Sequence, residues 1–269
     1  MSILSSGAIA LAAQSVTLAY EEKCIAEDLS VAIPEGKFSV IVGPNACGKS
    51  TLLRALSRLL VPQSGQVLLN GRDIQQQATK TVATQLGLLP QTATAPDGIR
   101  VIDLVARGRY PHQKWFQPWS DADQTALDEA LRATDTQNFA DQPVDQLSGG
   151  QRQRVWVAMA LAQQTPLLLL DEPTTYLDIA HQIELLDLFQ RLNHDNGQTM
   201  VAVLHDLNHA CRYADYLIAM KDGQIVATGH PSEIITADLV RQVFGLEALI
   251  IDDPVSHTPM IVPKGRYHY

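Results

Sequence analysis

Two spacings of apolar residues alternate along the chain. Apolar and polar residues take turns in 15–20 and 29–33, which predicts two half-buried strands, with a turn at 34–36 after the second. The next segment, 38–42, is mostly apolar and precedes a glycine, and over 49–60 the leucines recur at helical spacing. The start of the chain therefore predicts an antiparallel sheet, then a buried strand, a glycine-rich turn and a helix.

The same alternation of strands and helices continues to the end of the chain. Helical periodicity dominates 101–164, and another helix is predicted through 183–188. The further strands that we predict are 66–70, 86–91, 167–170, 199–204, 216–220 and 224–228, with tight turns at Asn70-Gly71 and Asp222-Gly223. Apolar strands separated by helices predict an α/β fold with a mostly parallel core sheet, covered on both faces.

The chain shows no internal repeat and no low-complexity linker, which favours a single domain. We expect that domain to span 13–264, with a helical subdomain inserted at about 95–165 and an N-terminal extension over 1–12. Small and apolar residues in 3–13 imitate a signal peptide, but no Lys or Arg precedes them.

Composition and net charge limit which ligands this chain is expected to bind. The 269 residues are 46% hydrophobic and 18% charged, as in a globular protein, and no apolar run approaches the roughly 20 residues that cross a bilayer. A formal charge of −9 argues against a broad grip on nucleic acid or anionic lipid. The cysteines, Cys24, Cys47 and Cys211, lack metal-ligand spacing and suit a reducing compartment. Any bound anion therefore needs a dedicated site.

Such a site is predicted where the buried strand meets the first helix. Residues 43–50 fit the phosphate-loop pattern Gly-x-x-x-x-Gly-Lys-Ser, and an ordinary glycine turn that caps a helix is the alternative. Backbone N–H groups and the helix N-terminus would bind phosphate, Lys49 would reach the terminal phosphates, and Ser50 would ligate Mg²⁺. The predicted phosphate loop comprises Gly43, Pro44, Asn45, Ala46, Cys47, Gly48, Lys49, Ser50 and Thr51.

Two acidic residues follow the apolar strand 167–170, at the end of a strand where parallel sheets place their ligands. We expect Asp171 to hold Mg²⁺ and Glu172 to orient or deprotonate the attacking water. The alternative is an acidic helix N-cap before Pro173.

A second phosphate-binding surface is predicted at the segment Leu147-Ser-Gly-Gly-Gln151, which precedes a helical pattern. Nearby Arg152 and Arg154 add positive charge, although the segment by itself also fits a capped turn. The candidate ligands of this surface are Ser148, Gly149, Gly150 and Gln151.

Together these segments resemble the ATP-binding cassette ATPases that drive membrane transporters. The resemblance spans essentially the whole chain and implies a P-loop ATPase fold with an N-terminal antiparallel β subdomain and an inserted helical subdomain. Six elements occur in the order of that family, namely residues 43–51, Gln91, residues 147–151, residues 167–172, Asp178 and His205.

The resemblance also implies how such a chain works. Two copies pair head to tail as a homodimer, and each MgATP lies between the phosphate loop of one copy and the Ser-Gly-Gly-Gln segment of the other. The dimer drives integral-membrane permease subunits at the cytoplasmic face of the inner membrane, and indirectly serves a substrate-binding protein. No nucleic acid takes part.

Single residues acquire roles from the same resemblance. Tyr20 would stack on adenine, Gln91 would sense Mg²⁺ and the attacking water, Asp178 would couple the two sites, and His205 would contact the γ-phosphate. Each has a simpler alternative: Tyr20 as an ordinary strand aromatic, Gln91 as a solvated loop residue, and His205 as a helix-entry residue.

Two residues of the predicted phosphate loop, Ala46 and Cys47, differ from a simple glycine-rich turn in backbone demand or reactivity. Ala46 stands where many relatives carry glycine, and a positive φ there would cost alanine on the order of 1 kcal/mol. Cys47, beside Lys49 and a helix N-terminus, has either some thiolate character or the role of a small packed residue.

The resemblance is strongest to importers of ferric siderophores, haem and cobalamin, through residues 106–112, 174–178, 204–208, 250–254 and 258–259. It implies uptake of an iron–siderophore complex, with haem or cobalamin import, a soluble cassette ATPase or a nucleotide kinase as alternatives. In this family, the neighbourhood of 91–117 receives a permease helix. Its candidate patch, or else an ordinary exposed helical face, contains Tyr110, Trp115 and Phe116 among Arg107, Arg109, His112 and Lys114.

Overall fold

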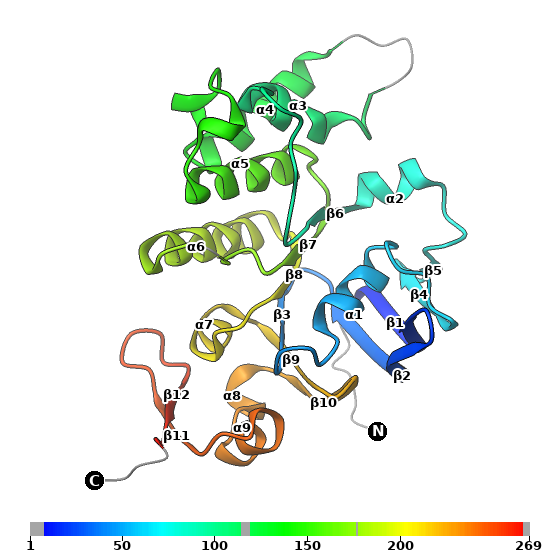
Figure 1. Cartoon of the computed structure of the whole chain (residues 1–269), viewed down its shortest axis with the longest axis vertical. Helices are drawn as coiled ribbons and strands as arrows, with labels where there is room; N and C mark the ends of the chain where they lie inside the picture. Colours follow the sequence, from blue (N-terminus) through cyan, green and yellow to red (C-terminus); the bar gives the residue numbers. More distant parts are fainter. Residues whose placement is uncertain (1–7, 114–118, 176, 266–269) are drawn as a thin grey trace. The chain divides into compact units, whose positions relative to one another are not determined.

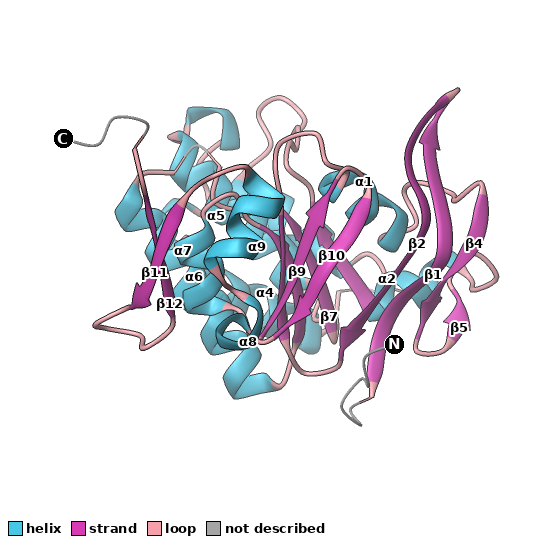
Figure 2. Ribbon diagram, turned by 90° about the horizontal axis from the view of Figure 1, so that it is seen from below, coloured by secondary structure: helices cyan, strands magenta, loops and turns pink. Residues whose placement is uncertain are grey.

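The computed structural model describes residues 8–113, 119–175 and 177–265. The chain divides into two compact units, the first formed by 1–76 with 199–269 and the second by 77–198. Both contain strands and helices, as the α/β prediction requires (Figures 1 and 2).

Unit one begins with an antiparallel sheet of order β2-β1-β4-β5 (Figure 2). The strands are β1 (Ile9–Tyr20), β2 (Lys23–Pro34), β4 (Ser64–Leu69) and β5 (Arg72–Asp73). The predicted extension over 1–12 is wrong for its last residues, because β1 starts at Ile9. Leu11 is fully buried and pairs with Ile33 on one side and Leu69 on the other, so burial of this apolar segment extends the strand.

A second group of strands in unit one carries the predicted parallel pattern. Its order is β10-β9-β3-β8, with β3 parallel to both β8 and β9, and with β9 and β10 joined as a hairpin. All residues of β3 and β8 are buried, which explains their unbroken apolar runs. The bounds are β3 (Phe38–Val42), β8 (Thr199–Val203), β9 (Tyr216–Lys221) and β10 (Gln224–Gly229).

The helix after β3 is shorter than predicted. Helix α1 (Lys49–Leu56) ends four residues before Leu60, the predicted end. Arg58 adopts a left-handed backbone (φ 65°), and the N–H groups of Leu59 and Leu60 both donate to the Arg54 carbonyl. This turn closes the helix and leaves Leu59 66% exposed, so the leucine spacing overstated its length.

The carboxyl end of unit one contains the helices α7 (Leu207–Tyr213), α8 (Pro231–Ile234) and α9 (Ala237–Phe244) and the hairpin β11 (Ala248–Asp252) and β12 (Pro259–Pro263). Helix α7 anchors the hairpin: the Asn208 side chain donates to the Ile261 carbonyl and accepts from its N–H. Arg212 donates to Asp253 at 2.6 Å and, with the N–H groups of Val255 and Ser256, keeps the pKa of that carboxyl well below its usual range.

Unit two pairs two parallel strands, β6 (Leu86–Leu89) and β7 (Leu167–Asp171). Its helices are α2 (Thr79–Gln85), α3 (Val101–Ala106), α4 (Asp121–Ala133), α5 (Gly149–Ala162) and α6 (Ile179–Asn196), with 3₁₀ turns at 107–109, 137–139 and 144–146. Helices α3, α4 and α5 contact one another (Figure 1). The predicted helical subdomain lies inside this unit. In the described part of the chain, no helix is long and apolar enough to cross a membrane.

A buried ion pair holds the helices of unit two together. Arg109, only 4% exposed, donates to Asp123 at 2.9 Å, to the Ala162 carbonyl at 2.8 Å and to Gln164 at 3.0 Å. Hydrogen bonds from Ser120 and Arg109 lower the pKa of Asp123. Removing one member of such a buried pair leaves an uncompensated charge and is strongly destabilising.

The candidate patch for a permease helix is wrong for part of its residues. Arg109 does not belong to an exposed surface, because its guanidinium serves the buried pair, and His112 is held by the Gln163 carbonyl at 2.7 Å. Tyr110 is 61% exposed, as such a patch would require. The predicted members Lys114, Trp115 and Phe116 lie outside the described residues.

Candidate functional site

The phosphate loop lies between β3 and α1, as predicted. Close packing explains the glycine at its start: a Cβ on Gly43 would come within 2.3 Å of the Met220 carbonyl oxygen. The carbonyl of Cys47 accepts from Gly223 N–H at 3.0 Å, so the β9–β10 turn is hydrogen-bonded to the backbone of the phosphate loop. The loop is thus held by unit one itself.

The N-terminus of helix α1 has the features of an anion-binding site. Gly48 precedes the helix without a side-chain cap, and no acidic residue occupies the first turn. Helices α5, α6 and α7 each start with a side chain that accepts from their first turn, whereas α2 and α3 also lack such a cap but do not follow a glycine-rich loop. An N-terminus without such a cap presents its N–H groups and positive dipole end to a phosphate. The residues present therefore fit a nucleotide phosphate.

The Lys49 ammonium is buried and already oriented toward the loop. Its Nζ donates to the carbonyls of Gly43 and Pro44, at 2.9 Å each. These bonds curve the loop around the cation, so a phosphate that enters the loop meets a positive charge whose position is set in advance.

Ala46 adopts a φ of 61°, which lies in the left-handed region that favours glycine. This is the positive φ that would strain an alanine at this position. We expect Ala46→Gly to raise the free energy of unfolding by about 0.5–1 kcal/mol, because relief of the strain exceeds the extra chain entropy of glycine. Thermal unfolding of the two proteins measures this. The control Ala133→Gly, at the last residue of α4, should destabilise the protein, and an equal loss at both positions would contradict the argument.

The structure supports the packed interpretation of Cys47. Its side chain is 4% exposed, and burial raises the pKa of the thiol despite the nearby Lys49. Burial also raises the pKa of Cys211 to about 12, whereas Cys24 is exposed. Neither buried thiol has the thiolate character that alkylation requires.

We therefore expect one rapidly reacting thiol per native chain and three after denaturation, measured with a chromogenic disulfide reagent. Cys24→Ser should remove the fast phase. Rapid labelling that persists in this variant would show that Cys47 or Cys211 is accessible.

Tyr20 and His205 also belong to unit one. Tyr20 is the last residue of β1 and 40% exposed, and Arg54 of α1 donates to its hydroxyl at 3.3 Å. This contact connects the predicted adenine platform to the helix that follows the phosphate loop. His205 is exposed between β8 and Asp206, whose side chain caps α7.

In unit two, Asp171 is the buried last residue of β7 and Glu172 follows it with a left-handed backbone, φ 52°. Gln91 donates through Nε2 to Glu172 Oε2 at 2.6 Å, and Thr175 donates to the same oxygen at 3.2 Å. The structure thus brings together two predicted site residues that are far apart in the sequence. The strained backbone at Glu172 is typical of residues held for function.

The Ser-Gly-Gly-Gln segment begins α5 with a capping box. Ser148 Oγ accepts from Gln151 N–H at 3.3 Å, and the Gln151 side chain accepts from Ser148 N–H at 3.0 Å. Both the capped-turn alternative and the phosphate prediction are compatible with this geometry, since the Ser148 hydroxyl can still donate its proton to an anion.

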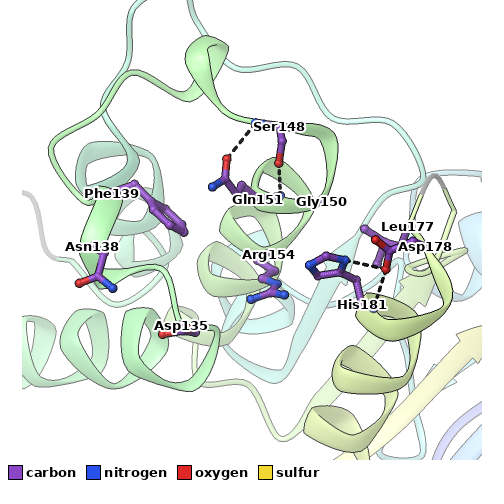
Figure 3. A pocket seen from close by; sticks show the side chains of 10 residues that line it. All are labelled: Asp135, Asn138, Phe139, Ser148, Gly150, Gln151, Arg154, Leu177, Asp178 and His181. Carbon is purple, nitrogen blue, oxygen red and sulfur yellow. Dashed lines mark hydrogen bonds and ion pairs between the residues drawn. The ribbon is translucent and has the colours of Figure 1, made fainter.

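The head of α5 and the start of α6 line one pocket of about 360 Å³ (Figure 3). Asp178 caps α6 and bonds the His181 ring at 2.6 Å; the N–H and the ring of His181 lower the pKa of this carboxyl. Four of the predicted site residues therefore line this pocket, namely Ser148, Gly150, Gln151 and Asp178. The remaining lining residues are Asp135, Asn138, Phe139, Arg154, Leu177 and His181.

Two residues of this region were missed by the sequence analysis. Thr175 bonds Glu172, and Gln153 of α5 donates through Nε2 to the Pro173 carbonyl at 2.9 Å. No local pattern identifies a bond over 20 positions. Among the described residues, no cluster of three or more His, Cys, Asp or Glu could hold a metal ion. Magnesium in nucleotide sites needs fewer protein ligands, because phosphates and waters complete its shell.

Comparison with known proteins places these features in context. The model of the ABC transporter family matches residues 26–175. The ferric enterobactin transport ATP-binding protein FepC of Escherichia coli (strain K12) is 57% identical over 256 residues, covering 95% of this chain and 94% of that protein.

Solved structures show the same architecture. A metal-chelate type ABC transporter in an inward-facing conformation gives a TM-score of 0.82 with 26% identity, covering 96% of this chain and 98% of the other. A dimeric ATP-binding cassette bound to ADP and Pi gives a TM-score of 0.72 with 28% identity, covering 82% and 98%.

Proposed function

Since this chain belongs to the ABC transporter family, we propose that it is the ATP-hydrolysing subunit of an importer for iron–siderophore complexes. The observation that carries the chemistry is the uncapped α1 N-terminus beneath a loop whose buried Lys49 is oriented in advance. The observation that carries the substrate class is the likeness, over almost the full length, to a ferric enterobactin transport protein.

In this proposal, the phosphate loop of unit one binds the nucleotide. The N–H groups of residues 43–51 and the Lys49 ammonium bind the phosphates, and Tyr20 stacks on adenine. By their chemistry, Ser50 is the proposed magnesium ligand of unit one, and Gln91 and Asp171 are the candidate ligands of unit two; Mg²⁺ neutralises charge on the phosphates when bound. His205 contacts the γ-phosphate. The fit rests on residue chemistry: a hydroxyl, an amide and a carboxylate are the oxygen ligands that this ion prefers.

Glu172 is the proposed general base. A carboxylate must be directed at the water that attacks the γ-phosphate, and the hydrogen bonds from Gln91 and Thr175 restrict where this carboxylate points. Because Gln91 is also a proposed magnesium ligand, arrival of MgATP would change its contact with Glu172.

A second copy of the chain completes each site. We propose that the Ser-Gly-Gly-Gln segment of one copy binds the ATP on the phosphate loop of the other, with Asp178 coupling the two sites. The dimeric cassette among the similar structures supports pairing of this kind. Nucleotide can then drive a conformational change, because closed and open dimers offer it different contacts.

The dimer would act at the cytoplasmic face of the inner membrane on permease subunits, and through them on a substrate-binding protein. No residue of this chain needs to touch the siderophore in this scheme. The metal-chelate transporter among the similar structures supports coupling to such a permease.

Uptake by a deletion strain tests the proposal. Cells without the gene should lose transport of radiolabelled ferric enterobactin under iron limitation, and the wild-type gene or Cys24→Ser should restore it, because Cys24 lies on an exposed strand position. Growth on haem and uptake of cobalamin should remain. Loss of haem or cobalamin uptake with intact siderophore transport would overturn the substrate class. Unchanged uptake of all three, and of a ferric hydroxamate siderophore measured in parallel, would overturn the importer role.

A further inference from the structure

The turn that carries Glu172 is tied to the helix that begins with the Ser-Gly-Gly-Gln segment. Gln153 stands five positions after Ser148, in the first turns of α5, and its side-chain amide donates to the Pro173 carbonyl at 2.9 Å. Pro173 is buried and directly follows Glu172. One side chain thus connects two segments to which the proposed function gives separate tasks.

Two hydrogen bonds and a proline constrain the turn that carries Glu172. The proline ring restricts φ at residue 173, and the Thr175 N–H donates to the Glu172 carbonyl at 3.2 Å. Thr175 also donates to the Glu172 carboxylate through its hydroxyl at 3.2 Å. Thr175 therefore holds both the backbone and the carboxylate of Glu172, within the same four residues that contain Pro173.

We infer that Gln153 is a positioning residue that couples the two nucleotide sites of the dimer. The inference rests on the proposed function, in which the head of α5 contacts the ATP held by the partner copy while Glu172 serves the ATP on its own chain's loop. Closure of one site moves α5, and Gln153 transfers that movement to the catalytic turn of the other site. Binding at one site then promotes hydrolysis at the other.

The test is the cooperativity of hydrolysis in the purified full-length chain, measured as rate against ATP concentration. A dimer with two coupled sites has a Hill coefficient between one and its limit of about 2. Gln153→Met keeps the length and helix propensity of the side chain but removes the donor, so its Hill coefficient should fall to about 1. ATP affinity at single-chain concentrations should change less than about two-fold, since binding to one loop does not use the tether.

A matched control lies directly after the end of the same helix. Gln163 follows the last residue of α5 and donates through Nε2 to the Ala83 carbonyl at 2.6 Å. This hydrogen bond does not involve the turn that carries Glu172. Gln163→Met should keep the cooperativity. Gln153→Glu offers a second test should the methionine variant fold poorly, because an ionised carboxylate cannot donate to a carbonyl.

The outcomes separate the inference from the function. Cooperativity that survives in both Gln153 variants, or an equal loss in Gln163→Met, overturns the coupling role while hydrolysis stands. A wild-type Hill coefficient of one also overturns it, since nothing would then be transmitted. A wild-type chain that does not hydrolyse ATP overturns the proposed function itself.

Discussion

Replacement of Glu172 by Gln should reduce ATP turnover by about 10²- to 10⁴-fold, because the amide cannot accept the proton of the attacking water. ATP should still bind, since the phosphate loop is untouched, and nucleotide-bound dimers should accumulate. Steady-state phosphate release, nucleotide affinity and size-exclusion chromatography with ATP measure the three effects. The separation of binding from turnover is the mark of a group that acts on the reacting atoms.

Glu184 provides the matched control for that experiment. Glu184 is a carboxylate of the same unit that pairs with Arg154 at 2.6 Å, and its own side chain is largely exposed. Glu184→Gln should therefore leave turnover near the wild-type rate. Wild-type turnover in Glu172→Gln would remove this residue from the catalytic role. Loss of ATP binding in the same variant would instead show that the substitution disturbs the fold.

Lys49→Ala should weaken ATP binding by roughly ten- to hundred-fold, which corresponds to the loss of about 1.5–3 kcal/mol from charge-assisted hydrogen bonds. Two effects add: the phosphates lose a buried counter-charge, and the carbonyls of Gly43 and Pro44 lose the donor that curves the loop. Titration with a fluorescent ATP analogue measures the affinity, and thermal unfolding shows whether the loop remains folded.

The control for Lys49 is Arg58→Ala in the same unit. Arg58 follows α1 and donates to the Gln75 carbonyl at 3.4 Å, so it is a cationic side chain that lies outside the phosphate loop. Its removal should leave nucleotide affinity within about two-fold of wild type, because Arg58 lies outside residues 43–51 and its hydrogen bond to Gln75 is not part of the loop. Undiminished ATP affinity in Lys49→Ala would contradict the proposed cradle.

The elements around the proposed phosphate loop are predictable from the sequence because their causes are local. A buried apolar strand, a glycine that packs against a carbonyl and a helix that starts at Lys49 occupy one continuous stretch of chain, so their order in the sequence is also their order in space. Turns such as Asn70-Gly71, with φ of 51° and 73°, follow from residue type in the same way. The resemblance to cassette ATPases depends on the same short motifs.

Errors arose where packing overrides pattern. The leucine spacing continues to Leu60, yet the left-handed backbone at Arg58 ends α1 earlier. Small apolar residues before Ala13 were assigned to an extension, although sheet pairing on both sides makes them part of β1. The resemblance includes Arg109 in the candidate patch for a permease helix, whereas its guanidinium forms a buried ion pair with Asp123 of α4.

Sequence alone identified the candidate segments of the proposed site, namely a phosphate-loop pattern, paired acids after an apolar strand and a Ser-Gly-Gly-Gln helix start, because each depends on neighbours along the chain. Only the tertiary structure decided which distant groups hold those residues in place. Gln91 meets Glu172 across 81 positions and Gln153 meets Pro173 across 20, and such contacts depend on how helices pack, which residue spacing does not encode.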